Sequence, residues 1–97
     1  MKVVFTQRSE ADLSALYDYI ADNSSLRIAG EYVASIQATC LMLADFPRRG
    51  VARPDLGDRI RTIPFQGRAV IAYRPDDDRV RILRIFAAGW DYGPRDF

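Results

Sequence analysis

The period of the apolar residues changes once along this chain, and that change constrains the fold more than any other feature. In the first half, apolar residues recur every three or four positions, as in an amphipathic helix; in the second half they alternate with polar residues, as in a strand. Two helices followed by strands predict an α+β fold. The helical stripes are Leu13, Leu16, Tyr17 and Ile20, and then Ala29, Val33, Ile36, Cys40 and Leu43.

Local signals place the helix ends and predict an antiparallel helical hairpin. Ser9, with Asp12 three residues later, is typical of a helix N-cap, so we expect the first helix to begin at Ser9. Residues 23–25 interrupt the pattern, and Pro47 follows the end of the second helix. The short link predicts that the two helices run antiparallel. A β-favouring run at residues 3–5 predicts a strand before them.

Three strands are expected after a loop at residues 47–58: residues 59–65, 69–74 and 79–86, joined by turns at 66–68 and 75–78. Short turns predict an antiparallel meander. Arg84 breaks the alternation of the last strand, which indicates a bulge or a change of face. Arg59 and Arg61 share one face opposite Ile60. We therefore expect a single domain over residues 1–97, with one sheet face against the helices and the other studded with arginine.

Composition excludes several classes of site. The chain has no histidine and one cysteine, Cys40, so we expect no disulfide, metal site or cofactor, and a buried thiol. The run Asp76 to Asp78 reads as a solvated turn. Nothing near the N-terminus resembles a signal peptide, and no apolar run approaches the length of a membrane span, which is about 20 residues. A soluble cytoplasmic protein is expected.

Charge is distributed unevenly. Residues 1–47 carry a net charge of −3 and residues 48–97 carry +4, and thirteen of the fourteen basic residues are arginine. Such asymmetry favours an anionic partner for the second half, either nucleic acid or an acidic protein segment. Two other interpretations require no partner. The arginines form a solvated face balanced by the nearby aspartates, and the C-terminal aromatic residues close the edge of the core. The candidate binding residues are Arg59, Arg61, Arg68, Arg74, Arg81, Arg84, Trp90 and Tyr92.

Several segments in this order resemble the ParE toxins of the ParE/RelE superfamily of bacterial toxin–antitoxin systems. The resemblance covers nearly the whole chain and implies a helical hairpin on a small antiparallel sheet, with the first strand at one edge. No segment is specific alone, but their order and spacing together are. They are Ala11-Asp12-Leu13, the run from Leu43 to Gly50 (LADFPRRG), Arg59-Ile60-Arg61, the run from Val70 to Arg74 (VIAYR), and the run from Val80 to Phe86 (VRILRIF).

The resemblance also implies partners. ParE-like members usually act on DNA gyrase and are neutralised by an antitoxin with a ribbon-helix-helix half, here a ParD-like protein, with no sequence-specific DNA binding by the toxin alone. RelE-like members instead cut mRNA on the ribosome. For that activity Arg68 occupies the position of a basic residue and Tyr92 is the candidate base, but small residues follow Phe86 and histidine is absent. The resemblance therefore favours gyrase inhibition without catalysis; a ribonuclease and a non-toxic antitoxin-binding co-repressor are the alternatives.

Overall fold

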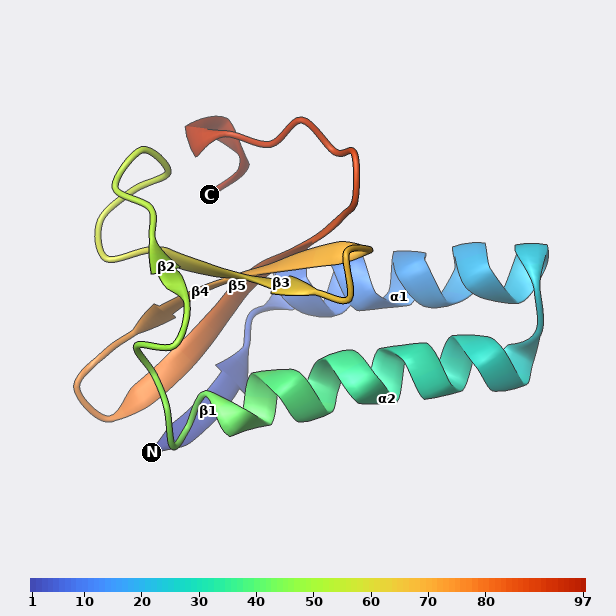
Figure 1. The fold of residues 1–97 in the computed structure, drawn as a ribbon, viewed down its shortest axis with the longest axis horizontal. Coiled ribbons are helices and arrows are strands. Elements are labelled where there is room, and N and C mark those ends of the chain that lie inside the picture. Colours follow the sequence, from blue (N-terminus) through green and yellow to red (C-terminus); the bar gives the residue numbers. More distant parts are fainter.

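Two antiparallel helices cover one face of a five-stranded sheet in the computed structural model, which describes residues 1–97 (Figure 1). The strand order is β1-β5-β4-β3-β2. The predicted α+β fold, with a helical hairpin on a sheet and the first strand at one edge, is confirmed. The elements are β1 (Lys2–Phe5), α1 (Gln7–Asn23), α2 (Leu26–Met42), β2 (Val51–Ala52), β3 (Arg61–Phe65), β4 (Ala69–Pro75), β5 (Arg79–Ala87) and η1 (Pro94–Asp96).

The first helix begins earlier than predicted. Thr6 is its N-cap, because the Thr6 side chain accepts a hydrogen bond from the Ser9 amide at 3.1 Å. Ser9 lies inside the first turn, fully buried, and its hydroxyl donates to the Thr6 carbonyl. The prediction of Ser9 as N-cap was therefore wrong by one turn. Ser25 caps α2 in the same way by accepting from the Ile28 amide.

The sheet differs from the predicted antiparallel sheet in two respects. β1 pairs with β5 in parallel, so the sheet is mixed. The segment predicted as a loop contains β2, which forms the far edge by pairing with β3. Arg59 was predicted to start a strand, but its backbone is left-handed, with φ 56°, and β3 begins only at Arg61. The turn at Arg59 buries the Ile60 side chain beside the sheet.

A bulge in β5 confirms the irregularity predicted at Arg84. Ala72 pairs with Arg84 and Tyr73 pairs with Ile82, so Leu83 is an extra residue without a partner. The extra residue lets both Ile82 and Ile85 join the core although they are three positions apart.

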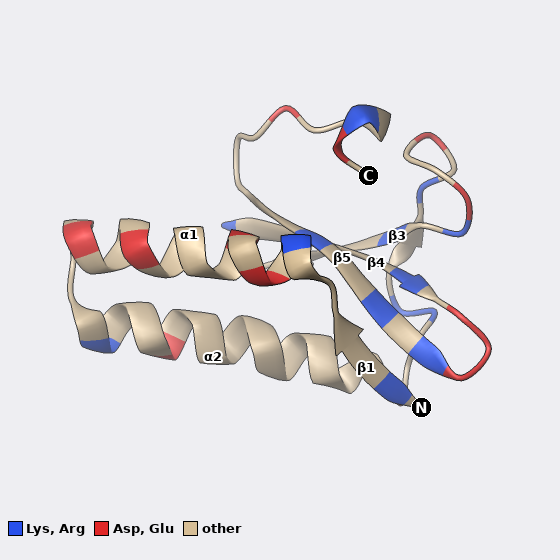
Figure 2. Cartoon of the chain, turned by 180° about the vertical axis from the view of Figure 1, so that it is seen from behind, with Lys and Arg blue, Asp and Glu red and all other residues tan.

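Both predicted helical stripes supply the core between the hairpin and the sheet, and Cys40 is buried there as expected. The other sheet face is covered by the C-terminal segment, whose Tyr92 ring stacks on Phe86 at 4.4 Å between ring centroids. Acidic residues are spaced along α1, and basic residues lie mostly on the strands β3, β4 and β5 and on the loops of the second half of the chain (Figure 2). Neither helix combines the length and apolarity needed to cross a membrane.

Candidate functional site

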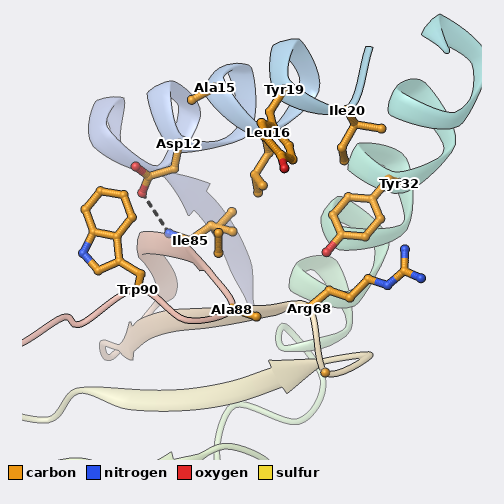
Figure 3. A pocket seen from close by; sticks show the side chains of 12 residues that line it. Asp12, Ala15, Leu16, Tyr19, Ile20, Tyr32, Arg68, Ile85, Ala88 and Trp90 are labelled. Carbon is orange, nitrogen blue, oxygen red and sulfur yellow. Dashed lines mark hydrogen bonds between the residues drawn. The ribbon is translucent and has the colours of Figure 1, made fainter. Parts of the chain in front are cut away.

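A groove of about 520 Å³ lies between α1 and the end of β5 (Figure 3). Nine of its twelve lining residues are hydrophobic, and two aromatic side chains there remain exposed: Tyr19 at 67% and Trp90 at 53%. An apolar groove with exposed aromatic residues is typical of a protein-binding surface. The walls come from Leu16, Tyr19 and Ile20 of α1, Tyr32 of α2, and Ile85, Ala87, Ala88 and Trp90 at the end of β5.

The floor of this groove is an unpaired sheet edge. β1 pairs only with residues 79–82 of β5, so the outer edge of β5 has no strand partner after Ile82. Asp12 fills part of the gap, because its carboxylate accepts a hydrogen bond from the Ile85 amide at 2.9 Å. Beyond that point the edge borders the groove, with Ala87 among the lining residues.

Arg68 gives the groove a positive charge on the side of the β3–β4 turn. Its side chain is exposed, forms no ion pair and lies beside Tyr32 (Figure 3). Burial raises the pKa of the Tyr32 hydroxyl, and the charge of Arg68 offsets part of that rise. Of the predicted arginines, Arg68 is the one that lines the groove.

Three of the predicted arginines converge on a single carboxylate. Arg81, Arg59 and Arg74 lie 3.0, 3.4 and 4.0 Å from the oxygens of Asp76. Arg79 pairs with Asp78 at 3.2 Å, and these hydrogen bonds lower the pKa of Asp78. Much of the arginine face is therefore balanced by aspartates of the adjacent turn, as expected for a face that requires no partner.

Arg61 does not lie on that face, contrary to prediction. It pairs with Tyr73 across the strands, so its side chain lies on the helix side of the sheet. Its guanidinium donates to the carbonyls of Gly50 at 2.7 Å and Arg48 at 3.3 Å. Arg61 thus holds the turn that joins α2 to β2.

Arg84 is likewise held inside the fold. Its side chain is 9% exposed and forms two hydrogen bonds with Asp12, of 2.8 and 3.0 Å, which raise the pKa of the guanidinium. It also donates to the carbonyl of Asp96. Arg84 therefore joins α1, β5 and the C-terminal segment, and little of its side chain is exposed. After the bulge it lies on the sheet face of Phe86, away from the helices, and it reaches Asp12 at the edge of β5.

Of the C-terminal aromatic residues, Tyr92 packs on the core, whereas Trp90 remains largely exposed and available to a partner. Tyr92 closes the sheet face over Phe86, and its hydroxyl accepts a hydrogen bond from Arg53. Trp90 contacts Phe86 at 6.0 Å between centroids, yet more than half of it stays exposed in the groove. The groove residues of α1 were missed as site residues; Tyr19, an aromatic residue beside the apolar stripe, was the available signal.

The structure does not bring the candidate ribonuclease residues together. Arg68 lines the groove on the helix side of the sheet, whereas Tyr92 packs on the opposite face. No three His, Cys, Asp or Glu side chains cluster as metal ligands. General acid–base catalysis needs its groups within hydrogen-bonding reach of one substrate. This pair does not meet that requirement in the geometry observed.

The family assignment follows from comparison with known proteins. Residues 3–92 match the family model described as the ParE toxin of the type II toxin–antitoxin system parDE. The chain belongs to the ParE toxin family. A curated relative, Toxin ParE3 of Caulobacter vibrioides, is 30% identical over 84 residues, which is 87% of this chain and 83% of the relative. The resemblance inferred from the sequence motifs is confirmed.

A solved structure shows the same fold. It is described as the chromosomal ParDE TA system from P. aeruginosa and matches with a TM-score of 0.80 and 25% sequence identity, covering 91% of this chain and 96% of the other. A curated relative thus matches most of this chain in sequence, and a solved structure matches most of it in fold. The chain is a ParE-type toxin of a type II toxin–antitoxin system.

Proposed function

We propose that this ParE-type toxin arrests growth in the cytoplasm by binding DNA gyrase, without catalysing a reaction of its own. A ParD-like antitoxin of the ribbon-helix-helix class neutralises it by direct binding. Family membership supports the pairing of toxin and antitoxin. The separation of Arg68 from Tyr92 supports a mode of action that depends on binding rather than catalysis.

The apolar groove is the observation that carries the antitoxin part of the proposal. An amphipathic helix places apolar residues at positions i, i+3, i+4 and i+7, and such a stripe fits a groove lined mainly by hydrophobic side chains. Tyr19 and Trp90 serve as aromatic anchors, because both are exposed and both line the groove. Arg68 pairs with an acidic residue of the bound helix.

A second antitoxin contact lies on the arginine face. Arg59, Arg74 and Arg81 surround Asp76, and an arginine fork binds carboxylates in general. An extended acidic segment of the antitoxin crosses this cluster and adds carboxylates around Asp76. Arg61 and Arg84 take no part, because their guanidinium groups are held by backbone carbonyls and by Asp12.

Induction of the toxin in bacteria, alone and together with the antitoxin encoded beside it, tests the proposal. We expect growth arrest that the antitoxin reverses, and accumulation of cleaved DNA when purified gyrase is incubated with the toxin. Normal supercoiling at excess toxin would refute the gyrase target. Transcript cuts in the ribosomal A site would indicate the ribonuclease instead, and harmless expression with tight antitoxin binding would indicate a co-repressor.

Substitutions in the groove test the antitoxin site. Trp90→Ala and Tyr19→Ala remove exposed aromatic anchors, and a loss of about 2 kcal/mol for each corresponds to roughly 30-fold weaker binding. Leu26→Ala is the matched control, since Leu26 is 69% exposed and lies outside the groove. Titration calorimetry measures the difference. Equal affinities for all three variants would place the antitoxin elsewhere.

A further inference from the structure

Apolar side chains gather on a second surface, at the C-terminal end of α2. Nine large apolar residues of the chain are exposed, and three of them fall within six consecutive residues at the end of α2. Single exposed apolar residues are common, but a concentration of this kind indicates a contact surface. The three are Leu41 at 57%, Met42 at 42% and Phe46 at 63% exposure.

The backbone that carries this surface is fixed by the fold. Phe46 continues the helical hydrogen bonding through its amide, which donates to the Met42 carbonyl at 3.2 Å. On the far side of the turn, the Gly50 amide donates to the buried Tyr73 hydroxyl, and the same hydroxyl donates to the Pro47 carbonyl. Buried Leu43 anchors the helix end. Phe46 is therefore held outward by a rigid turn.

Two arginines beside Phe46 have no internal partner. Arg48 and Arg49 are exposed and form no ion pair, in contrast to the arginines around Asp76. With Phe46 and Pro47 they line a hollow of about 580 Å³. Asp45 is the one acidic residue between Leu41 and Ala52, so the surface carries a net positive charge.

We infer that the surface made by Leu41, Met42, Phe46, Arg48 and Arg49, called the α2-end surface, binds the toxin's target through an acidic protein segment with an apolar anchor. This inference rests on the proposed function, because it assigns a surface to the target. Phenylalanine, methionine and arginine are enriched at the centres of protein interfaces. Two unpaired guanidinium groups next to an exposed aromatic ring complement carboxylates placed beside an apolar side chain.

The α2-end surface is separate from the antitoxin groove. None of its residues lines the groove, and the groove residue of α2, Tyr32, lies ten positions before Met42, about 15 Å along the helix. Arg48 is near the second antitoxin contact, because it lines a hollow together with Arg59 and Asp76. The other four side chains of the α2-end surface take part in neither antitoxin contact. Mutation can therefore separate target binding from antitoxin binding.

The test uses the full chain carrying Leu41→Ser, Phe46→Ser and Arg49→Glu, and it leaves Arg48 unchanged because Arg48 lies near the second antitoxin contact. The matched control carries Leu26→Ser and Arg27→Glu at the opposite end of α2, about 25 Å away. Three properties are measured for both: growth arrest on induction, affinity for the antitoxin encoded beside the toxin, and melting temperature. We expect the triple variant to lose toxicity, with survival rising at least about 100-fold, while its antitoxin affinity stays within about threefold of wild type. The control should keep both.

Each other outcome overturns the inference in a distinguishable way. A triple variant as toxic as wild type refutes the target surface and leaves the proposed function intact. If the triple variant loses both toxicity and antitoxin binding while its melting temperature is unchanged, the separation of the two surfaces is refuted. A wild-type chain that does not arrest growth refutes both proposals. Labelled single-stranded or duplex DNA that binds wild type but not the triple variant would replace the acidic protein segment with nucleic acid.

Discussion

The ion pair between Asp12 and Arg84 should determine the stability of this fold, and removing one partner is the sharpest test of that assignment. The Asp12 carboxylate accepts hydrogen bonds from two nitrogens of Arg84, at 2.8 and 3.0 Å, and from the Ile85 amide at 2.9 Å. The side chains are only 15% and 9% exposed. Arg84→Met leaves the carboxylate with the Ile85 amide alone and removes the donor to the Asp96 carbonyl.

Breaking a buried pair by removing one partner costs about 3–5 kcal/mol, because the remaining charge is left uncompensated. A domain of this size has a total stability of about 5–15 kcal/mol. Since 1 kcal/mol corresponds to roughly 4–8 °C for a domain of this length, a loss of 3 kcal/mol lowers the melting temperature by about 12–24 °C. Asp12→Ala should cost a similar amount.

Thermal and urea unfolding of Arg84→Met, Asp12→Ala and the double variant measure this energy. The double variant should lose less than the sum of the singles, because it leaves neither charge unpaired. Arg81→Met is the matched control: Arg81 is 44% exposed and bonds to Asp76, so its pair contributes about 1 kcal/mol or less. If Arg84→Met melts within a few degrees of Arg81→Met, the structural assignment of Arg84 is refuted.

Other perturbations report on separate parts of the molecule. Gly50→Ala should lower the melting temperature, because a Cβ there would lie 2.7 Å from the Tyr73 hydroxyl and 2.8 Å from a backbone carbonyl. Burial raises the pKa of the Cys40 thiol to about 12, so a thiol reagent at pH 8 should modify Cys40 only as fast as the chain unfolds. Burial also raises the pKa of the Tyr73 hydroxyl above its unfolded pKa of about 10. The contribution of this hydroxyl to stability is therefore complete below the unfolded pKa and is lost as the pH rises through the folded pKa. Alkaline unfolding of Tyr73→Phe should show a weaker pH dependence than that of the wild type. Asp76→Asn should tighten antitoxin binding and steepen its salt dependence, because it removes the carboxylate that competes for three arginines.

The helices and strands were predictable because each depends on a local period. The stripe containing Ile36 and Cys40 is the buried side of α2, and the alternation of Val80 and Ile82 is the buried side of β5. The parallel pairing of β1 was not predictable in this way, since residues 2–5 lie 77 positions from their partners at residues 79–82. β2 has only two residues, too few to show a period.

Site residues were harder to predict because a side chain's role depends on its partner rather than on its own type. Counting arginines indicated a basic face, but the count does not show that Asp76 balances three of them or that Asp12 buries Arg84. The bulge at Leu83 places Arg84 on the sheet face away from the helices, beside Phe86, and no local pattern fixes which residue is extra.

The arginines left over after internal pairing should contribute most to the binding of partners. Arg48, Arg49 and Arg68 are exposed, form no ion pair, and each borders an apolar surface. A guanidinium without an internal carboxylate loses only hydration when a partner's carboxylate arrives, whereas Arg81 would first have to share or give up Asp76. Charge reversal at Arg68 should therefore weaken antitoxin binding more than charge reversal at Arg81, although both arginines belong to the same strand-rich half of the sequence. Equal losses in binding affinity for Arg68→Glu and Arg81→Glu would contradict this ranking.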